Sequence, residues 1–234
     1  MNEAEFKTRL QELSVQQMKL DQERKVRNFR ELNKIAKKGA ILFTGSSLME
    51  LFPICEIAQS RGVDKLIYNR GIGGFTTDDF LREIDTVLLD LAPSKVFINI
   101  GTNDMSERKY GPDWIDRLMT NYEKILTILK EKLPKTEVYM LAWYPANLHL
   151  PWQTPESIQW MQSRTVENIA ECNRRAEALA GEMGFHFINC NAGITDEKGE
   201  QKQEFAIDGV HMWANAYFSV FDALKEYLST KEHL

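Results

Sequence analysis

Residues 40–47 read AILFTGSS, and this short stretch decides the fold. Its first five residues are an apolar run of strand length, and Gly45-Ser46-Ser47 leads directly into a helical pattern that extends to about residue 60. Four more apolar runs of similar length follow along the chain, at Leu66–Asn69, Lys95–Ile100, Glu137–Ala142 and Phe185–Ile188. Further helical patterns lie near 77–91, 113–132, 156–183 and 213–230.

Strands that are separated by helices pair in parallel, and strands that are apolar throughout are covered on both faces. The sequence therefore predicts an α/β protein, a three-layer α/β/α fold with about five parallel strands.

Residues 1–38 differ from the rest, because they are rich in Glu, Gln, Lys and Arg and contain neither Gly nor Pro. Their apolar residues have roughly helical spacing, which predicts one long helix or two shorter ones ending at Gly39. We expect this N-terminal extension to pack on the main domain of residues 39–234, with a homodimer through the extension as the alternative. A sustained coiled coil is not expected, because the heptads break.

The composition sets further bounds. The 234 residues carry a formal net charge of −5, which argues against a nucleic-acid partner. Cys55, Cys172 and Cys190 lack the spacing of a zinc site or a disulfide framework, and we interpret them as buried free thiols in a reducing compartment. The charged N-terminus resembles no secretory signal and no stretch is long enough to span a membrane, so the expected location is the cytoplasm.

Polar segments follow the predicted strands at the points where ligands bind in open parallel sheets. Residues 45–47 (GSS), 69–74 (NRGIGG) and 101–104 (GTND) each follow a strand, and residues 208–211 (DGVH) precede the last helix. Together these four segments predict one site at the carboxyl edge of the sheet.

Three of these residues have the chemistry of nucleophilic catalysis. The Ser47 hydroxyl is a weak nucleophile at neutral pH and needs an adjacent base, which His211 can provide. Asp208 lies three residues before His211, close enough to orient the imidazole. Each signal alone has a simpler explanation, a helix N-cap for the serine and a surface ion pair for Asp208 and His211.

Acyl transfer also requires hydrogen-bond donors for the oxyanion. The Gly71 N–H, the Asn103 side-chain amide and the Ser47 N–H can supply them, although a tight turn and an Asx-turn also explain Gly71 and Asn103. Asp104 is interpreted as structural.

In this order, the four segments resemble blocks I, II, III and V of the SGNH (GDSL-type) hydrolases, and the resemblance spans residues 40 to 230. The resemblance implies a flavodoxin-like fold and an enzyme that cleaves esters and some thioesters without a metal or cofactor. Carried onto this chain, it implies Ser47 as nucleophile, His211 as base, Asp208 as its partner, and Gly71 and Asn103 as oxyanion donors. The sequence is most similar to the subgroup resembling platelet-activating-factor acetylhydrolase.

The chain departs from the family at Ser46, where an aspartate is usual. Ser46 is therefore a candidate for tuning the rate or the substrate, and an alternative register makes it the reactive hydroxyl. Arg70, Trp143, Tyr144 and Trp152 are candidates for contacting the substrate, because they lie in or beside the loops of the predicted site.

Single motifs in the sequence suggest other functions. Residues 71–74 (GIGG) suggest a dinucleotide fingerprint, but its third glycine would fall at Thr76, and no phosphate-binding P-loop motif occurs. We therefore expect a small-molecule ester as substrate, a short-acyl or acetyl ester in the first instance. A lysophospholipase or thioesterase acting on lipid-like carriers, and a non-catalytic binding protein on the same fold, remain as alternatives.

Overall fold

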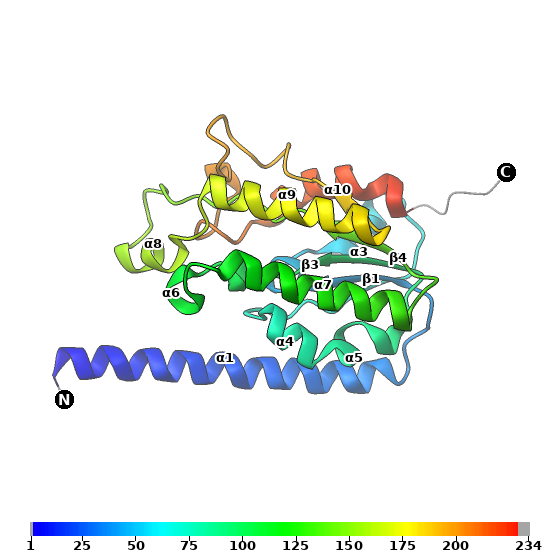
Figure 1. Cartoon of the computed structure of the whole chain (residues 1–234), viewed down its shortest axis with the longest axis horizontal. Helices are drawn as coiled ribbons and strands as arrows, with labels where there is room; N and C mark the ends of the chain where they lie inside the picture. The colour runs from blue at the N-terminus through cyan, green and yellow to red at the C-terminus, as the bar shows by residue number, and fades with distance from the viewer. Residues whose placement is uncertain (1, 229–234) are drawn as a thin grey trace.

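The computed structural model describes residues 2–228 of the chain. Its centre is a five-stranded sheet with the order β2-β1-β3-β4-β5, in which every neighbouring pair is parallel (Figure 1). The strands are β1 (Ile41–Gly45), β2 (Ile67–Asn69), β3 (Lys95–Asn99), β4 (Glu137–Leu141) and β5 (His186–Ile188). This 2-1-3-4-5 order is that of flavodoxin-like folds. The predicted fold class is confirmed.

The longer helices alternate with these strands. They are α1 (Glu3–Asn33), α3 (Ile54–Ser60), α4 (Thr77–Arg82), α7 (Trp114–Lys132), α8 (Pro155–Met161), α9 (Val166–Met183) and α10 (Ala214–Leu228). Shorter helical turns are α2 (Ser47–Glu50), α5 (Ile84–Val87), α6 (Glu107–Tyr110) and the 3-10 helices η1 (Leu89–Leu91), η2 (Thr102–Asp104) and η3 (Gln203–Phe205). Within the described residues, no helix is both long and apolar enough to cross a bilayer.

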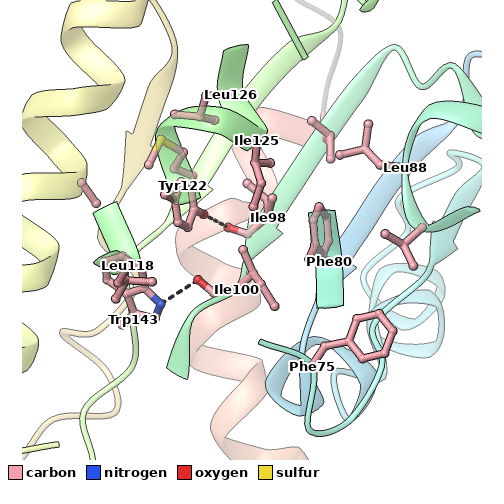
Figure 2. Packing of buried hydrophobic residues seen from close by; sticks show 14 of the residues in the cluster. Phe75, Phe80, Leu88, Ile98, Ile100, Leu118, Tyr122, Ile125, Leu126 and Trp143 are labelled. Carbon is pink, nitrogen blue, oxygen red and sulfur yellow. Dashed lines mark hydrogen bonds between the residues drawn. The ribbon is translucent and has the colours of Figure 1, made fainter. Parts of the chain in front are cut away.

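Successive strand residues point to opposite faces of the sheet, so each strand contributes to two separate cores. Val96 and Ile98 belong to the core that α4, α5, α7 and α9 cover, which is shown in Figure 2. Phe97, between them in sequence, belongs to the core beneath α2, α3 and α10, where it stacks 4.7 Å from both Phe43 and Tyr139. The helices on both faces explain why the strands are apolar throughout.

The N-terminal extension is one helix. Asn2 caps α1 by accepting a hydrogen bond from the Glu5 N–H, and the helix ends at Asn33, before the predicted stop at Gly39. Its second half packs against α5, with Val26 buried in the core. Its first half extends beyond the sheet and helices, as Figure 1 shows, and carries exposed apolar side chains.

The predicted strands agree with the observed ones to within about one residue at each end. The predicted helix 156–183 is two helices, α8 and α9, and the pattern at 77–91 is divided among α4, α5 and η1. The predicted helix 213–230 corresponds to α10, and its last two residues lie outside the described part of the chain. Cys172 and Cys190 are buried free thiols as expected, but Cys55 is exposed.

Candidate active site

The four predicted polar segments come together at the carboxyl edge of the sheet. Segments 45–47, 69–74 and 101–104 end or follow β1, β2 and β3, which run in parallel and therefore share this edge. Segment 208–211 immediately precedes α10 and reaches the same edge through a contact between His211 and Ser47.

Ser47, His211 and Asp208 form a continuous line of hydrogen bonds. The Ser47 Oγ lies 2.8 Å from the His211 Nε2, and the His211 Nδ1 lies 2.7 Å from the Asp208 Oδ2. A carboxylate can only accept, so a neutral His211 carries its proton on Nδ1 and leaves Nε2 free to accept the serine proton. The arrangement can therefore deprotonate the Ser47 hydroxyl as it attacks an electrophile.

The second oxygen of Asp208 fixes the backbone of its own loop. The Asp208 Oδ1 accepts hydrogen bonds from the Val210 and His211 N–H groups, each 2.9 Å long. Burial favours the neutral carboxyl, but these bonds and the bond from the His211 ring outweigh burial and lower the pKa of Asp208 to about 2. The carboxylate is thus ionised at neutral pH, as an orienting partner for an imidazole must be.

Backbone packing dictates where Ser47 lies. β1 ends at Gly45, where φ is +152° and a methyl group would lie 1.9 Å from the Asn99 O of the neighbouring strand, so only glycine fits. α2 begins immediately at Ser47, and the Tyr217 hydroxyl anchors it to α10 by donating to the Leu48 O at 2.8 Å. As the first helical residue, Ser47 has an N–H without an acceptor inside the helix.

Ser46 does not face the site. Its side chain is fully buried as the N-cap position of α2, and its Oγ has no hydrogen-bond partner. The predictions that it contacts substrate or serves as the alternative reactive hydroxyl are therefore wrong, because the histidine meets Ser47 instead.

The structure does not support Gly71 as an oxyanion donor. The Gly71 N–H donates to the Asn69 Oδ1 at 2.9 Å, and a methyl group on Gly71 would lie 2.2 Å from the Glu50 N. Gly73 is the glycine of this turn that lies beside the nucleophile, since a methyl group there would lie 3.8 Å from the Ser47 Cβ. The sequence contained both glycines, but their spacing alone did not distinguish them.

Three further side chains at this turn were missed by the sequence analysis. The Gly73 N–H donates to the Glu50 Oε2 at 2.6 Å, and the Glu50 Oε1 lies 2.5 Å from the Lys25 Nζ. The Gln22 Nε2 donates to the Gly73 O at 2.8 Å. Glu50 could have been suspected, because it lies one helical turn after Ser47, but no sequence signal singles out Gln22 or Lys25.

Asn103 lies on η2 and is held against the same turn. Its Nδ2 donates one hydrogen to the Phe75 O at 3.0 Å, two residues beyond Gly73. An amide nitrogen carries two hydrogens, so a second one is available for another acceptor.

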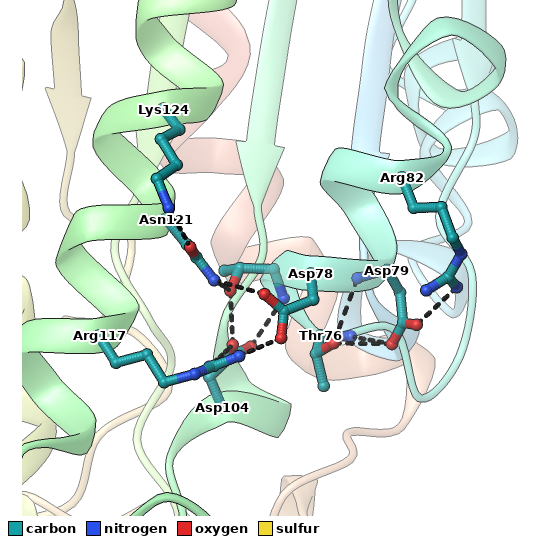
Figure 3. A network of polar contacts seen from close by, with 9 residues as sticks. Thr76, Asp78, Asp79, Arg82, Asp104, Arg117, Asn121 and Lys124 are labelled. Carbon is teal, nitrogen blue, oxygen red and sulfur yellow. Dashed lines mark hydrogen bonds and ion pairs between the residues drawn. The ribbon is translucent and has the colours of Figure 1, made fainter.

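Asp104 has a structural position, as its sequence context predicted. Its buried carboxylate accepts from the Thr77 N–H at 2.9 Å, and from the Thr77 hydroxyl and the Arg117 guanidinium. Figure 3 shows this network, in which Arg117 and Asn121 of α7 also contact Asp78. Burial raises the pKa of Asp104 despite these bonds. The network fixes the loop that presents Asn103.

Three of the residues expected to contact substrate are instead parts of the protein interior. The Arg70 Nε donates to the Asn33 Oδ1 of α1 at 3.1 Å, and its guanidinium lies over the Phe29 ring. Trp143 is buried and donates from Nε1 to the Ile100 O at 2.9 Å, as Figure 2 shows. Tyr144 is also buried. The substrate-contact prediction is wrong for these three, because none of them has a surface for a ligand.

Trp152 is the one aromatic residue of the predicted set that is exposed. Its Nε1 donates to the Ile207 O at 2.9 Å, next to Asp208, and half of its surface is accessible. With the exposed Trp213 it lines a hollow of about 680 Å³, which Gln203 and Glu204 also border.

The chain is similar to known ester hydrolases. The model of the "GDSL-like Lipase/Acylhydrolase family" matches residues 56–217. The platelet-activating factor acetylhydrolase IB subunit alpha1 of Bos taurus is 25% identical over 193 residues, which cover 82% of this chain and 76% of that protein. The Homo sapiens protein of the same name is 24% identical over the same length.

Solved structures agree. A protein from Streptococcus pneumonia named for platelet activating factor is 31% identical, with a TM-score of 0.83 and coverage of 95% of this chain and 99% of that one. A GDSL-like lipase from Bacteroides thetaiotaomicron shares the fold at 23% identity and a TM-score of 0.70, over 87% and 96% of the two chains. An acetyl-xylooligosaccharide esterase from Geobacillus shares it at 17% identity and 0.63, over 85% and 98%. The match of the family model over most of the chain, on a fold of this kind, shows that the chain belongs to the GDSL-like lipase/acylhydrolase family and is a hydrolase that acts on ester bonds.

Proposed function

We propose that this protein is a serine esterase that cleaves short-acyl esters through an acyl-enzyme on Ser47. The observation that carries the proposal is the line of hydrogen bonds from Ser47 through His211 to Asp208. Both bonds are of ordinary hydrogen-bond length, so His211 is in position to take the proton of the Ser47 hydroxyl.

In the first half-reaction, the His211 Nε2 takes the Ser47 proton while the Ser47 Oγ attacks the ester carbonyl carbon. The Ser47 N–H and the second amide hydrogen of Asn103 are the proposed donors to the oxyanion. When the tetrahedral intermediate collapses, the bond to the alcohol breaks and His211 protonates the leaving oxygen. The acyl group remains on Ser47.

In the second half-reaction, a water molecule attacks the acyl-enzyme and gives its proton to the His211 Nε2. Collapse of this intermediate releases the carboxylic acid and returns the proton to the Ser47 Oγ. Asp208 holds the imidazole in one tautomer throughout and stabilises the imidazolium that forms in both steps. The protein groups alone provide the proton transfers that this chemistry needs.

The test is a series of p-nitrophenyl esters from acetyl to long acyl chains, hydrolysed by the parent protein and by Ser47→Ala. We expect turnover that is highest for the shortest acyl groups and absent in Ser47→Ala. Equal rates in the two proteins would reject Ser47 as the nucleophile. A rate that rises with acyl length would favour the lysophospholipase or thioesterase alternative.

The hollow lined by Trp152, Trp213 and Ile207, the residue before Asp208, favours a carbohydrate as the alcohol part of the ester. Exposed indoles such as Trp152 and Trp213 present flat apolar faces with polar neighbours, which suit a sugar ring better than a flexible alkyl chain. We expect Trp213→Ala to raise the KM for an acetylated monosaccharide and to leave p-nitrophenyl acetate unaffected. An equal change for both substrates would contradict a sugar-binding hollow.

A further inference from the structure

The N-terminal helix contacts the turn that lies beside the nucleophile. The Gln22 side chain of α1 donates to the Gly73 O, and a methyl group on Gly74 would lie 2.8 Å from the Met18 Sδ. The helix is therefore not only an extension of the domain, because its middle third lies against the candidate active site.

Lys25 makes the second contact, through a carboxylate. Its Nζ lies 2.5 Å from the Glu50 Oε1 and 2.6 Å from the Asp21 Oδ2. The other Glu50 oxygen accepts from the Gly73 N–H at 2.6 Å. Side chains thus hold Gly73 at both its N–H and its carbonyl, and both sets originate on or are anchored by α1.

The charge of Glu50 has a consequence for catalysis. A methyl group on Gly73 would lie 2.9 Å from the Glu50 Oε2 and 3.8 Å from the Ser47 Cβ, so the carboxylate and the nucleophile flank the same point. A negative charge here repels the oxyanion that forms next to Ser47, unless a cation neutralises it. Lys25 is positioned to be that cation, and its bonds to Asp21 and Glu50 raise its pKa despite the opposing effect of burial.

We propose that Lys25 is a positioning residue that acts through Glu50: it neutralises this carboxylate and holds it on the Gly73 N–H, which keeps the turn in place beside Ser47. The proposal rests on the proposed serine esterase function. The Asn103 amide donates to the Phe75 O, two residues beyond Gly73, so the segment that Lys25 and Glu50 hold also leads to a contact of the proposed oxyanion donor.

The experiment compares kcat and KM for p-nitrophenyl acetate in Lys25→Met, Lys25→Arg, Glu50→Gln and the double variant Lys25→Met/Glu50→Gln. We expect Lys25→Met to lower kcat about tenfold with little change in KM, because the uncompensated carboxylate opposes the oxyanion and not the neutral ester. Lys25→Arg keeps the charge and should stay near the parent. The double variant should recover most of the loss, since glutamine still accepts from the Gly73 N–H without the charge.

Arg9→Met is the matched control, because Arg9 lies on the same helix, is largely exposed and pairs with Glu12, away from Lys25. It should keep the parent kcat. A merely structural contribution of Lys25 predicts no recovery in the double variant. The proposal would therefore be overturned by a double variant as slow as Lys25→Met, or by a Lys25→Met protein with the same kcat as Arg9→Met.

A second readout does not depend on the choice of ester. Phosphylation by a fluorophosphonate joins phosphorus to the Ser47 Oγ, expels fluoride and transfers the serine proton to His211, and intact mass spectrometry follows its rate. The same order of variants is expected. The proposed function fails if the parent protein neither hydrolyses esters nor reacts with the fluorophosphonate, or if Ser47→Ala hydrolyses and reacts as fast as the parent. The inference alone fails if the parent is active, Ser47→Ala is inactive, and the Lys25 variants have the rates of the parent.

Discussion

Replacing Gly71 with alanine tests the structural basis of the site most directly, because it adds one methyl group where the turn meets α2. The residue has an ordinary backbone conformation, so the substitution introduces no φ strain and acts through packing alone. The methyl group would lie 2.2 Å from the Glu50 N, 2.7 Å from the Met49 C and 2.8 Å from the Glu50 Cα. All three are backbone atoms of the short helix that begins at Ser47.

Ordinary contact begins at 3.4 Å, so the turn and α2 must separate by about 1 Å at Gly71. Overpacking of this kind costs about 1–3 kcal/mol of stability. A displacement of about 1 Å at a reacting group can lower the rate about 10²-fold. The substitution should therefore reduce activity far more than the population of folded protein.

Urea unfolding and p-nitrophenyl acetate hydrolysis measure the two effects on the same preparation. The matched control is Gly181→Ala in α9, where a methyl group meets nothing within 4 Å. That control should gain about 0.5–1 kcal/mol and keep full activity. A Gly71→Ala protein with parent stability and parent kcat would refute the close approach of the turn to α2.

Three further substitutions test the other parts of the site. Asp208→Asn should lower kcat about 10⁴-fold by disturbing the His211 tautomer. Its loss of stability relative to the parent should shrink as the pH falls from 3.8 toward 2, because the lowered pKa of Asp208 stabilises the folded state only while the carboxyl is ionised. A loss of stability that is constant over this pH range would contradict the assignment. Asn103→Ala should lower kcat by about 10²–10³ in a folded protein, and hydrolysis at the parent rate would exclude it as an oxyanion donor. Asp104→Ala should cost about 1–3 kcal/mol by leaving the Thr77 N–H buried without an acceptor, which thermal unfolding would measure.

The fold was predictable from the sequence because its signals are local. Each strand is a short apolar run, and the alternation with helical patterns leaves a parallel sheet as the arrangement that covers every apolar face. The sequence analysis missed the break between α8 and α9, because residues 162–165 (QSRT) contain neither Gly nor Pro to mark the end of a helix. Thr165 accepts a hydrogen bond from the Asn168 N–H and starts a new helix there.

The candidate site was predictable to the extent that its chemistry requires particular residue types. A serine, a histidine and an aspartate follow strands or precede a helix, and the structure brings them into hydrogen-bond contact. The errors concern residues whose environment depends on distant segments. Arg70 lies beside the turn in sequence, but Asn33 and Phe29 of α1 draw its guanidinium into the interior.

The same dependence on distant segments explains why the sequence did not distinguish the two glycines of the turn. Sequence places Gly71 and Gly73 two residues apart, and either N–H could face a ligand. Residues from other parts of the chain distinguish the two glycines. The backbone of α2 lies against Gly71, whereas the side chains of Gln22 and Glu50 bind Gly73. The helix that resembles a detachable extension in sequence therefore helps to determine the geometry beside the nucleophile, and its removal should change catalysis as well as stability.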